Sequence, residues 1–475
     1  MSTTKVGAVP RSIKAGFGLA ELGITSVQIV TQLYLLEFYT QIVGLKASLA
    51  GIALAISVVW DAVSDPVMGV ISDNTKSQWG RRRPYIFLGS LSLGISVVFL
   101  FAPPQISDQT MLFLYLLFNY IALNTAMTVL SVPHLALGGE LSPDPRDRTE
   151  IFGWRLFFSN LGILFGMIFP ALILQSLGDE NSSENVLLAR RISAWAIGGL
   201  VILSGWATFF ITGSSRIPTT SHLTHKESLN LSFLFRSFSQ VLSNKIFLPL
   251  FIAFVVATFG RTLNTSTALF YYKYRLGLSE SDVVLRILLP FFVIIILSIP
   301  FWVWLSNLYG KKMPAFFGIF ILGIATIIAY PLYPYGNPYY PLVTAILGGI
   351  CAGSIFLLDS LVADIVDYDE LKTGEMKEGM YFGFWKMGTK FSQAISLALS
   401  GVMLDWIGFE KGSYQQTEEV RLRLAIVFGP LVGGFFVLGA ILFLWMPLTN
   451  SLHQRILKLL DLKRKRHSRL LDITK

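Results

Sequence analysis

The segment Val59-Trp60-Asp61-Ala62-Val63-Ser64-Asp65-Pro66 carries two acidic residues in the middle of an apolar stretch that runs from residue 49 to residue 72. A helix crosses a bilayer with ~20 mostly apolar residues, so this stretch is long enough to span. Asp61 and Asp65 lie ~12–18 Å of helix rise before the polar Asp73. Placing an acidic side chain at that depth in the bilayer costs free energy. The segment therefore indicates a membrane protein with a functional site inside the bilayer.

The composition of the whole chain agrees with this interpretation. Of 475 residues, 53% are hydrophobic and 14% are charged, against ~25% charged in soluble domains. This excludes a disordered chain and disfavours a soluble one. The single cysteine excludes a disulfide framework and a Cys-rich metal site. Twelve long apolar segments follow one another: 17–43, 49–72, 85–103, 111–140, 151–177, 192–213, 246–272, 282–308, 314–333, 340–368, 380–408 and 422–448. Continuous segments of this length predict helices and not a β-barrel.

The distribution of basic residues predicts the topology. One set of alternate loops, with both ends of the chain, holds 25 of the 38 Lys and Arg residues, and the other set holds 7. The positive-inside rule then puts both termini in the cytoplasm. We expect a multi-pass protein of the plasma (inner) membrane, with a short basic cytoplasmic segment at the start. Six basic residues remain in or near the apolar segments: Arg155, Arg261, Arg286, Lys386, Lys390 and Arg423.

The net charge of +9 also has a local source near the end of the chain. Lys463-Arg464-Lys465-Arg466 stands among leucines, which predicts a basic amphipathic helix on anionic lipid. Nucleic acid is the competing partner for such a cluster, and we reject it because no recognition fold accompanies the basic residues.

Two sequence matches at one offset indicate an internal repeat. The turn Gly80-Arg81-Arg82-Arg83-Pro84 corresponds to Gly310-Lys311-Lys312-Met313-Pro314, and Phe152-Gly153-Trp154-Arg155 corresponds to Phe382-Gly383-Phe384-Trp385-Lys386, both about 230 residues apart. The predicted organisation is a six-helix half over 1–213, a cytoplasmic linker over 214–245, a second half over 246–449 and a basic tail over 450–475. Parallel six-helix repeats are the layout of major-facilitator transporters, with a site near the midplane.

Asp61 and Asp65 are the strongest candidates for a cation site. They share one helix face, where they would repel each other unless a cation, a proton or a basic residue lies beside them. Ser64 offers a hydroxyl, and Pro66 frees a backbone carbonyl. The positions that correspond to the two aspartates in the second half are Phe291 and Ile295, so the site is not duplicated. The alternative interpretation is a structural ion pair between helices.

Other polar residues in apolar segments need partners as well. The available acids are Glu21, Asp61, Asp65 and Asp359, and the expected pairs are Glu21 with Arg155 and the span-two aspartates with Lys390. Lys386 and Arg155 have the alternative of reaching the cytoplasmic interface. For His134 we favour a hydrogen-bonding core residue over a proton relay. Trp60, Trp154 and Trp385 are mainly packing residues or interface anchors, although one of them is a candidate stacking platform for a sugar. No enzyme motif occurs in a credible context, so we do not expect an enzyme.

Two motifs resemble the glycoside–pentoside–hexuronide:cation symporters, a branch of the major facilitator superfamily that includes the melibiose carrier. The first runs from Trp60 to Gly69 and on through Ser72-Asp73-Asn74-Thr75-Lys76-Ser77 to Trp79-Gly80. The second is Val362-Ala363-Asp364-Ile365-Val366-Asp367-Tyr368, followed by Lys372-Thr373-Gly374 and Glu378-Gly379. The resemblance covers essentially the whole chain and implies an all-α membrane protein with twelve transmembrane helices in two six-helix halves.

The resemblance also implies roles for particular residues. It implies a site for Na⁺ or H⁺ at Asp61, Asp65, Ser64 and Thr128, with the neighbouring lysine at Lys390, and no cofactor besides the coupling ion. It implies sugar contacts at Glu21 and Arg155.

This chain also departs from the melibiose carrier in the sugar pocket. A second sugar-binding acid falls at Ser131, a span-one lysine at Ala20 and a span-eleven threonine at Lys386. An added lysine and a lost acid favour an acidic glycoside such as a hexuronide. The implied activity is cation-coupled sugar symport. The alternatives are a cation-coupled lysolipid symporter, as in the eukaryotic members of the family, and a non-transporting membrane sensor with the same fold.

Overall fold

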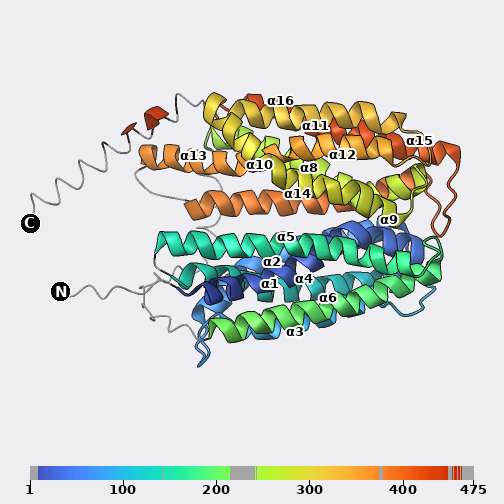
Figure 1. Ribbon diagram of the computed structural model, residues 1–475, viewed down its shortest axis with the longest axis horizontal. Helices are drawn as coiled ribbons and strands as arrows, with labels where there is room; N and C mark the ends of the chain where they lie inside the picture. Colours follow the sequence, from blue (N-terminus) through green and yellow to red (C-terminus); the bar gives the residue numbers. More distant parts are fainter. Residues whose placement is uncertain are drawn as a thin grey trace, which may run out of the picture. The chain divides into compact units, whose positions relative to one another are not determined.

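The computed structural model describes residues 9–142, 144–213, 241, 243–373 and 378–447, together with the tail residues 452, 454–456, 458, 459 and 462. Within this part the chain forms helices and no strand (Figure 1). Most of the predicted linker and the whole Lys463–Arg466 cluster lie outside the described residues.

The first part of the chain forms six long helices that run side by side in Figure 1. They are α1 (Arg11–Glu37), which continues into a short π-helical segment η1 (Phe38–Ile42), α2 (Ala47–Asn74), α3 (Arg83–Phe101), α4 (Gln109–Glu140), α5 (Pro145–Ser176) and α6 (Ser183–Thr212). Asp108, Asp144 and Ser182 cap α4, α5 and α6 by accepting hydrogen bonds from backbone amides of the first turn. Helix α1 packs against α5 and α6, and α3 packs against α4 and α6.

The later part of the chain has shorter and more interrupted helices. They are α8 (Phe247–Leu269) with the π-helical η2 (Phe270–Arg275), α9 (Glu280–Asp282), η3 (Val283–Leu288), α10 (Leu289–Tyr309), α11 (Lys312–Leu332), α12 (Tyr339–Ala352), η4 (Gly353–Ile355), α13 (Phe356–Thr373), α14 (Glu378–Trp406), α15 (Glu418–Ile426), η5 (Val427–Leu431) and α16 (Val432–Leu444). Several of these follow directly on one another, so that Phe247–Arg275, Glu280–Tyr309, Tyr339–Thr373 and Glu418–Leu444 are each one continuous span.

The predicted all-α membrane fold with twelve spans is confirmed. Eleven helical stretches in the described part are long and apolar enough to cross a membrane. Helix α14 is the twelfth, long enough at 29 residues but more polar, since it carries Lys386 and Lys390. Each of the twelve overlaps one predicted apolar segment.

The chain divides into two compact units whose boundaries differ from those of the sequence repeat. The first unit is drawn from residues 1–222, 265–285 and 394–421, and the second from 223–264, 286–393 and 422–475. The ends of α8 and α14 therefore pack with α1–α6. Gly401 of α14 permits this, because a Cβ atom there would lie 2.1 Å from the carbonyl oxygen of Ala47 at the start of α2.

The structure repeats where the sequence repeats. Gly80 and Gly310, which correspond in the repeat, both adopt left-handed backbone with φ of +87° and +78°, which favours glycine. After Gly80, Arg82 binds Asp73 and Glu140. After Gly310, Lys311 Nζ lies 2.6 Å from Asp364 Oδ1. The basic turns thus tie helix ends together in both halves of the sequence repeat.

Candidate functional site

Asp61 and Asp65 lie on one face of α2 and share a single hydroxyl group. Thr128 Oγ1 of α4 is 2.8 Å from Asp61 Oδ1 and 2.9 Å from Asp65 Oδ1. A threonine hydroxyl has one hydrogen and can donate it to only one of the two carboxylates at a time. The other contact brings two acceptor oxygens together, which is favourable when a proton, a cation or a basic residue also lies there. The geometry therefore suits cation binding.

Further oxygen atoms surround this acid pair. Ser64 Oγ lies 3.3 Å from Thr128 Oγ1 and donates a hydrogen bond to the backbone carbonyl oxygen of Asp61 at 3.2 Å. Thr128 is buried, whereas Asp61, Ser64 and Asp65 are half-buried. Carboxylate and hydroxyl oxygens are ligands that hard cations prefer. The structure thus brings together all four residues that the sequence assigned to the cation site, and their role in binding stays a prediction.

Glu21 and Arg155 form the predicted ion pair between α1 and α5. Arg155 Nε and Nη2 donate to Glu21 Oε2 and Oε1 at 3.0 and 2.8 Å, so the pair is bidentate. The Glu21 side chain is almost buried, while the Arg155 side chain keeps 32% of its surface exposed. A partly exposed guanidinium held by a buried carboxylate is available to a ligand.

His134 is a buried hydrogen-bonded residue, as the sequence favoured, but it also contacts Glu21. Its Nε2 lies 2.8 Å from the carbonyl oxygen of Phe17, and its ring stacks on the Phe17 ring. Because a carbonyl only accepts, Nε2 carries the hydrogen. Its Nδ1 is 3.5 Å from Glu21 Oε2, an approach that is favourable when one hydrogen lies between the two atoms. Glu21 thus has two possible proton-bearing neighbours.

The remaining predicted site residues lie on α4 and α14. Ser131 is half-buried on α4, one turn before His134. Lys386 is exposed and Lys390 is half-buried on α14. Both lysines belong to the second compact unit, while the span-two aspartates belong to the first. The pairing of Lys390 with those aspartates stays a prediction.

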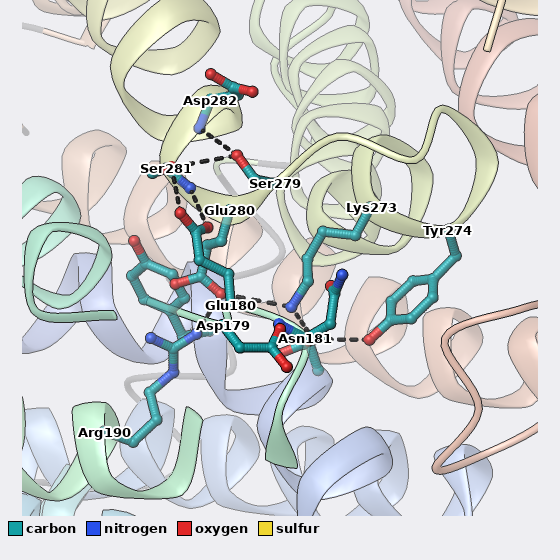
Figure 2. Close-up of polar contacts among 12 residues, drawn as sticks. Asp179, Glu180, Asn181, Arg190, Lys273, Tyr274, Ser279, Glu280, Ser281 and Asp282 are labelled. Atoms are coloured by element: carbon teal, nitrogen blue, oxygen red, sulfur yellow. Dashed lines mark hydrogen bonds and ion pairs between the residues drawn. The ribbon is translucent and has the colours of Figure 1, made fainter. Parts of the chain in front are cut away.

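A buried cluster of four charged side chains was missed by the sequence interpretation; Figure 2 labels three of them, Arg190, Lys273 and Glu280. Arg190 Nη2 of α6 lies 2.6 Å from Glu280 Oε2 of α9, and Lys273 Nζ of η2 lies 2.7 Å from Glu37 Oε1 of α1 and 3.5 Å from Glu280 Oε2. None of these side chains is more than 3% exposed. We call this group the four-charge cluster. It joins the predicted outer ends of α1 and α6 to segments from the second half of the sequence.

Aromatic residues surround the four-charge cluster. The Tyr274 hydroxyl donates to Glu37 Oε1 at 2.9 Å, and the Arg190 guanidinium lies 4.2 Å above the Tyr34 ring. The Tyr414 ring lies 5.8 Å from Lys273 Nζ. Burial raises the pKa of the Tyr414 hydroxyl, which therefore stays neutral beside the cluster.

The sequence interpretation of Arg190 and Lys273 was wrong in one respect. Both were counted in external loops, but the structure has them inside α6 and η2. The helices extend beyond the apolar segments because ion pairing compensates for the buried charges. Glu37 carried a signal that was overlooked, since it is an acid within the apolar segment 17–43, as Glu21 is.

Comparisons with known proteins agree with this architecture. The sequence model of a family described as MFS/sugar transport protein matches residues 16–450. An uncharacterized symporter, YnaJ, of Bacillus subtilis (strain 168) is 27% identical over 83% of this chain and 83% of its own length. The putative glycoside/cation symporter YagG of Escherichia coli (strain K12) is 27% identical over 87% of each chain. The sodium-dependent lysophosphatidylcholine symporter 1 of Gallus gallus is 26% identical over 88% of this chain and 82% of its own.

Solved structures of major-facilitator transporters share the fold. A bacterial homologue of the human lysosomal transporter Spinster, in an inward-facing and unoccupied conformation, superposes with a TM-score of 0.65 at 14% identity, covering 92% of this chain and 98% of that one. The nucleoside transporter NupG gives a TM-score of 0.59 at 16% identity, covering 91% of this chain and 98% of that one.

Proposed function

Since the chain belongs to the MFS/sugar transport protein family and is a multi-pass membrane transporter and not an enzyme, we propose that it couples the entry of a cation to the uptake of a glycoside. The observation that carries the proposal is the acid pair Asp61 and Asp65, which shares the one hydroxyl of Thr128. A cation, a proton or a basic residue beside such a pair relieves the repulsion between its carboxylates, and we assign this role to the coupling ion. The coupling ion is Na⁺ or H⁺.

A sugar is the substrate class that the Glu21–Arg155 pair fits. A carboxylate and a guanidinium held side by side offer acceptors and donors to neighbouring hydroxyls. The printed description of the family and the name of the YagG relative support the same class. Ser131 and Lys386 in place of an acid and a threonine favour an acidic glycoside such as a hexuronide.

A lysophospholipid is the second candidate substrate. The name of the Gallus gallus relative supports it, because that protein is a sodium-dependent lysophosphatidylcholine symporter and aligns with most of this chain. Both candidates require the same cation site and differ in the substrate they take.

Coupling requires that the carrier open to one side of the membrane at a time. The four-charge cluster joins α1 and α6 to η2 and α9, at the helix ends that the charge count assigns to the outside. We take it as the outer closure. We further propose the plasma (inner) membrane as the location, cytoplasmic termini and an anionic-lipid contact for the basic tail.

Counterflow in proteoliposomes tests the proposed function. Proteoliposomes that contain the purified protein are loaded with one compound from a panel of neutral methyl glycosides, methyl glucuronide and lysophosphatidylcholine. Exchange is measured with and without Na⁺ and at two pH values. We expect exchange of a glycoside that rises with the cation gradient and is lost in Asp61→Asn. The matched control is Asp179→Asn, which removes an exposed carboxylate from the loop between α5 and α6.

The other outcomes are distinct. Exchange of lysophosphatidylcholine alone selects the second candidate. Binding of a glycoside without exchange under any condition identifies a sensor. Uptake that remains fully cation-dependent in Asp61→Asn contradicts the assigned cation site.

A further inference from the structure

Two residues of opposite charge lie deep in spanning helices of the second unit, and both are exposed. Arg261 is at the centre of the span Phe247–Arg275, and Asp359 is near the middle of the span Tyr339–Thr373. At 1.5 Å of rise per residue, both lie roughly 20 Å or more from the ends of their spans. Charged side chains at such depth face a protein interior or a water-filled cavity, because lipid contact is too costly. Both residues are exposed, which favours an aqueous cavity over a packed protein interior as their environment.

A buried tryptophan holds the Asp359 carboxylate in position. Trp385 Nε1 of α14 donates a hydrogen bond to Asp359 Oδ1 at 2.6 Å. The Trp385 ring is 5% exposed and stacks on Phe254 of α8 with ring centroids 3.6 Å apart. A carboxylate has about four acceptor sites, and the indole occupies one. The exposed side of Asp359 is thus presented to the cavity in a fixed orientation.

The guanidinium group of Arg261 supplies N–H donors near the Asp359 carboxylate. Its charge is close enough to Asp359 for the two to interact electrostatically. Together they offer carboxylate acceptors and guanidinium donors without a net charge. A neutral ligand that carries several hydroxyls matches this combination, whereas a ligand carboxylate would be repelled by Asp359.

The sequence repeat supplies an independent comparison. Trp385 lies in the segment Phe382–Lys386, which matches Phe152–Arg155, and Lys386 is its basic residue. In the first unit, Arg155 donates two hydrogen bonds to Glu21. In the second unit, Trp385 from the matching segment donates one hydrogen bond to Asp359. In both units, therefore, an N–H donor from the repeated segment holds a carboxylate of a spanning helix.

We propose that Asp359 and Arg261 form a substrate subsite for the hydroxyl groups of a sugar ring, and that Trp385 is the residue that positions Asp359. The inference rests on the proposed function and deepens it, because it adds the second unit to the substrate contacts. It also assigns a neutral, hydroxyl-bearing part of the substrate to this subsite.

Substrate and cation affinities measured separately test the subsite. The probe is a neutral methyl glycoside that gives counterflow with the wild-type protein. We expect Asp359→Asn and Arg261→Gln each to raise KM for this probe about tenfold or more. This is the effect of losing one hydrogen bond between the probe and a charged group. The cation also stabilises the sugar-free protein against unfolding. The concentration of Na⁺ or H⁺ that gives half of this stabilisation should differ by less than twofold between each variant and the wild type. The control is Glu418→Gln, which removes an exposed carboxylate at the start of α15.

Trp385→Phe tests the positioning role, because it keeps a ring to stack on Phe254 and removes the N–H donor. We expect a smaller rise in KM, and no further rise when it is combined with Asp359→Asn, since both act through one carboxylate. If Asp359→Asn is poorly folded, Trp385→Phe and Asp359→Glu carry the same prediction.

Three results would overturn the subsite. One is an unchanged KM in both Asp359→Asn and Arg261→Gln. Another is that these variants change KM for lysophosphatidylcholine and not for the glycoside. The third is that the effects of Trp385→Phe and Asp359→Asn on KM add up fully in the double variant. The first leaves cation-driven uptake intact and so spares the proposed function. Failure of the wild-type protein to exchange any member of the panel refutes the proposed function itself.

Discussion

Replacement of Arg190 by methionine is the sharpest test of the four-charge cluster. The cluster contains two acids and two bases, and the side chains of Arg190 and Glu280 are 0% exposed. Arg190→Met leaves Glu280 with Lys273 at 3.5 Å, while Lys273 lies closer to Glu37 at 2.7 Å. One base then serves two buried acids. Removal of one partner from a buried pair destabilises a protein by about 3–5 kcal/mol, so we expect a loss of that size in the free energy of unfolding.

Removal of both partners of that pair should have a much smaller effect. Arg190→Met combined with Glu280→Leu leaves the Glu37–Lys273 pair, with the Tyr274 hydroxyl still donating to Glu37. Replacement of a buried ion pair by apolar residues of similar volume is often neutral or stabilising. We expect the double variant to be more stable than Arg190→Met.

Reversible unfolding in mixed micelles, titrated with sodium dodecyl sulfate, gives the four free energies of a double-mutant cycle. The surface control is Arg81→Met, because the Arg81 side chain is 41% exposed in its pair with Glu140 at 2.9 Å. An exposed pair contributes about 0–1 kcal/mol. The reasoning is refuted if Arg190→Met loses no more than Arg81→Met, or if the losses of the two single variants add up in the double variant.

The other predictions concern the cation site and the helix contacts. Thr128→Val removes the hydroxyl shared by Asp61 and Asp65, so the half-saturating cation concentration for uptake should rise about tenfold or more; an unchanged cation dependence contradicts its place in the site. Asp65→Asn should likewise weaken cation stimulation of counterflow, and unaltered stimulation would restrict the site to the other three residues. Gly401→Ala should lower the yield of folded protein in size-exclusion chromatography, because its Cβ atom has no room, whereas Gly139→Ala, with no atom within 4 Å of the new Cβ, should behave as the wild type.

The spanning helices and the local charge pairs were predictable from the sequence for physical reasons. An apolar stretch of sufficient length must form a helix in lipid, so each predicted segment matches a described helix. Glu21 and Arg155 were paired correctly because a charge inside such a stretch needs a partner. Thr128 followed from the family resemblance, and its contact with both aspartates agrees with that assignment.

The four-charge cluster could not be predicted by the same reasoning. Arg190 and Lys273 stand next to polar residues at the borders of apolar segments, where the sequence does not distinguish a loop from a buried helix end. Their burial depends on Glu37 and Glu280, and the sequence separations of 236 residues for Lys273–Glu37 and 90 residues for Arg190–Glu280 are too long for local patterns. Trp385 was likewise predicted mainly as a packing residue, because only its position in space gives Asp359 as its partner.

The composition of the four-charge cluster also has a consequence for biosynthesis. Glu37 is translated 236 residues before Lys273, and Arg190 is translated 90 residues before Glu280. During this interval the nascent chain already holds α1 through α6, with one acid and one base that lack their final partners. The ion pairs Lys273–Glu37 and Arg190–Glu280 can form only after residues 273 and 280 have been synthesised. The contacts that complete the outer ends of α1 and α6 thus form late, although these helices precede their partners in the chain.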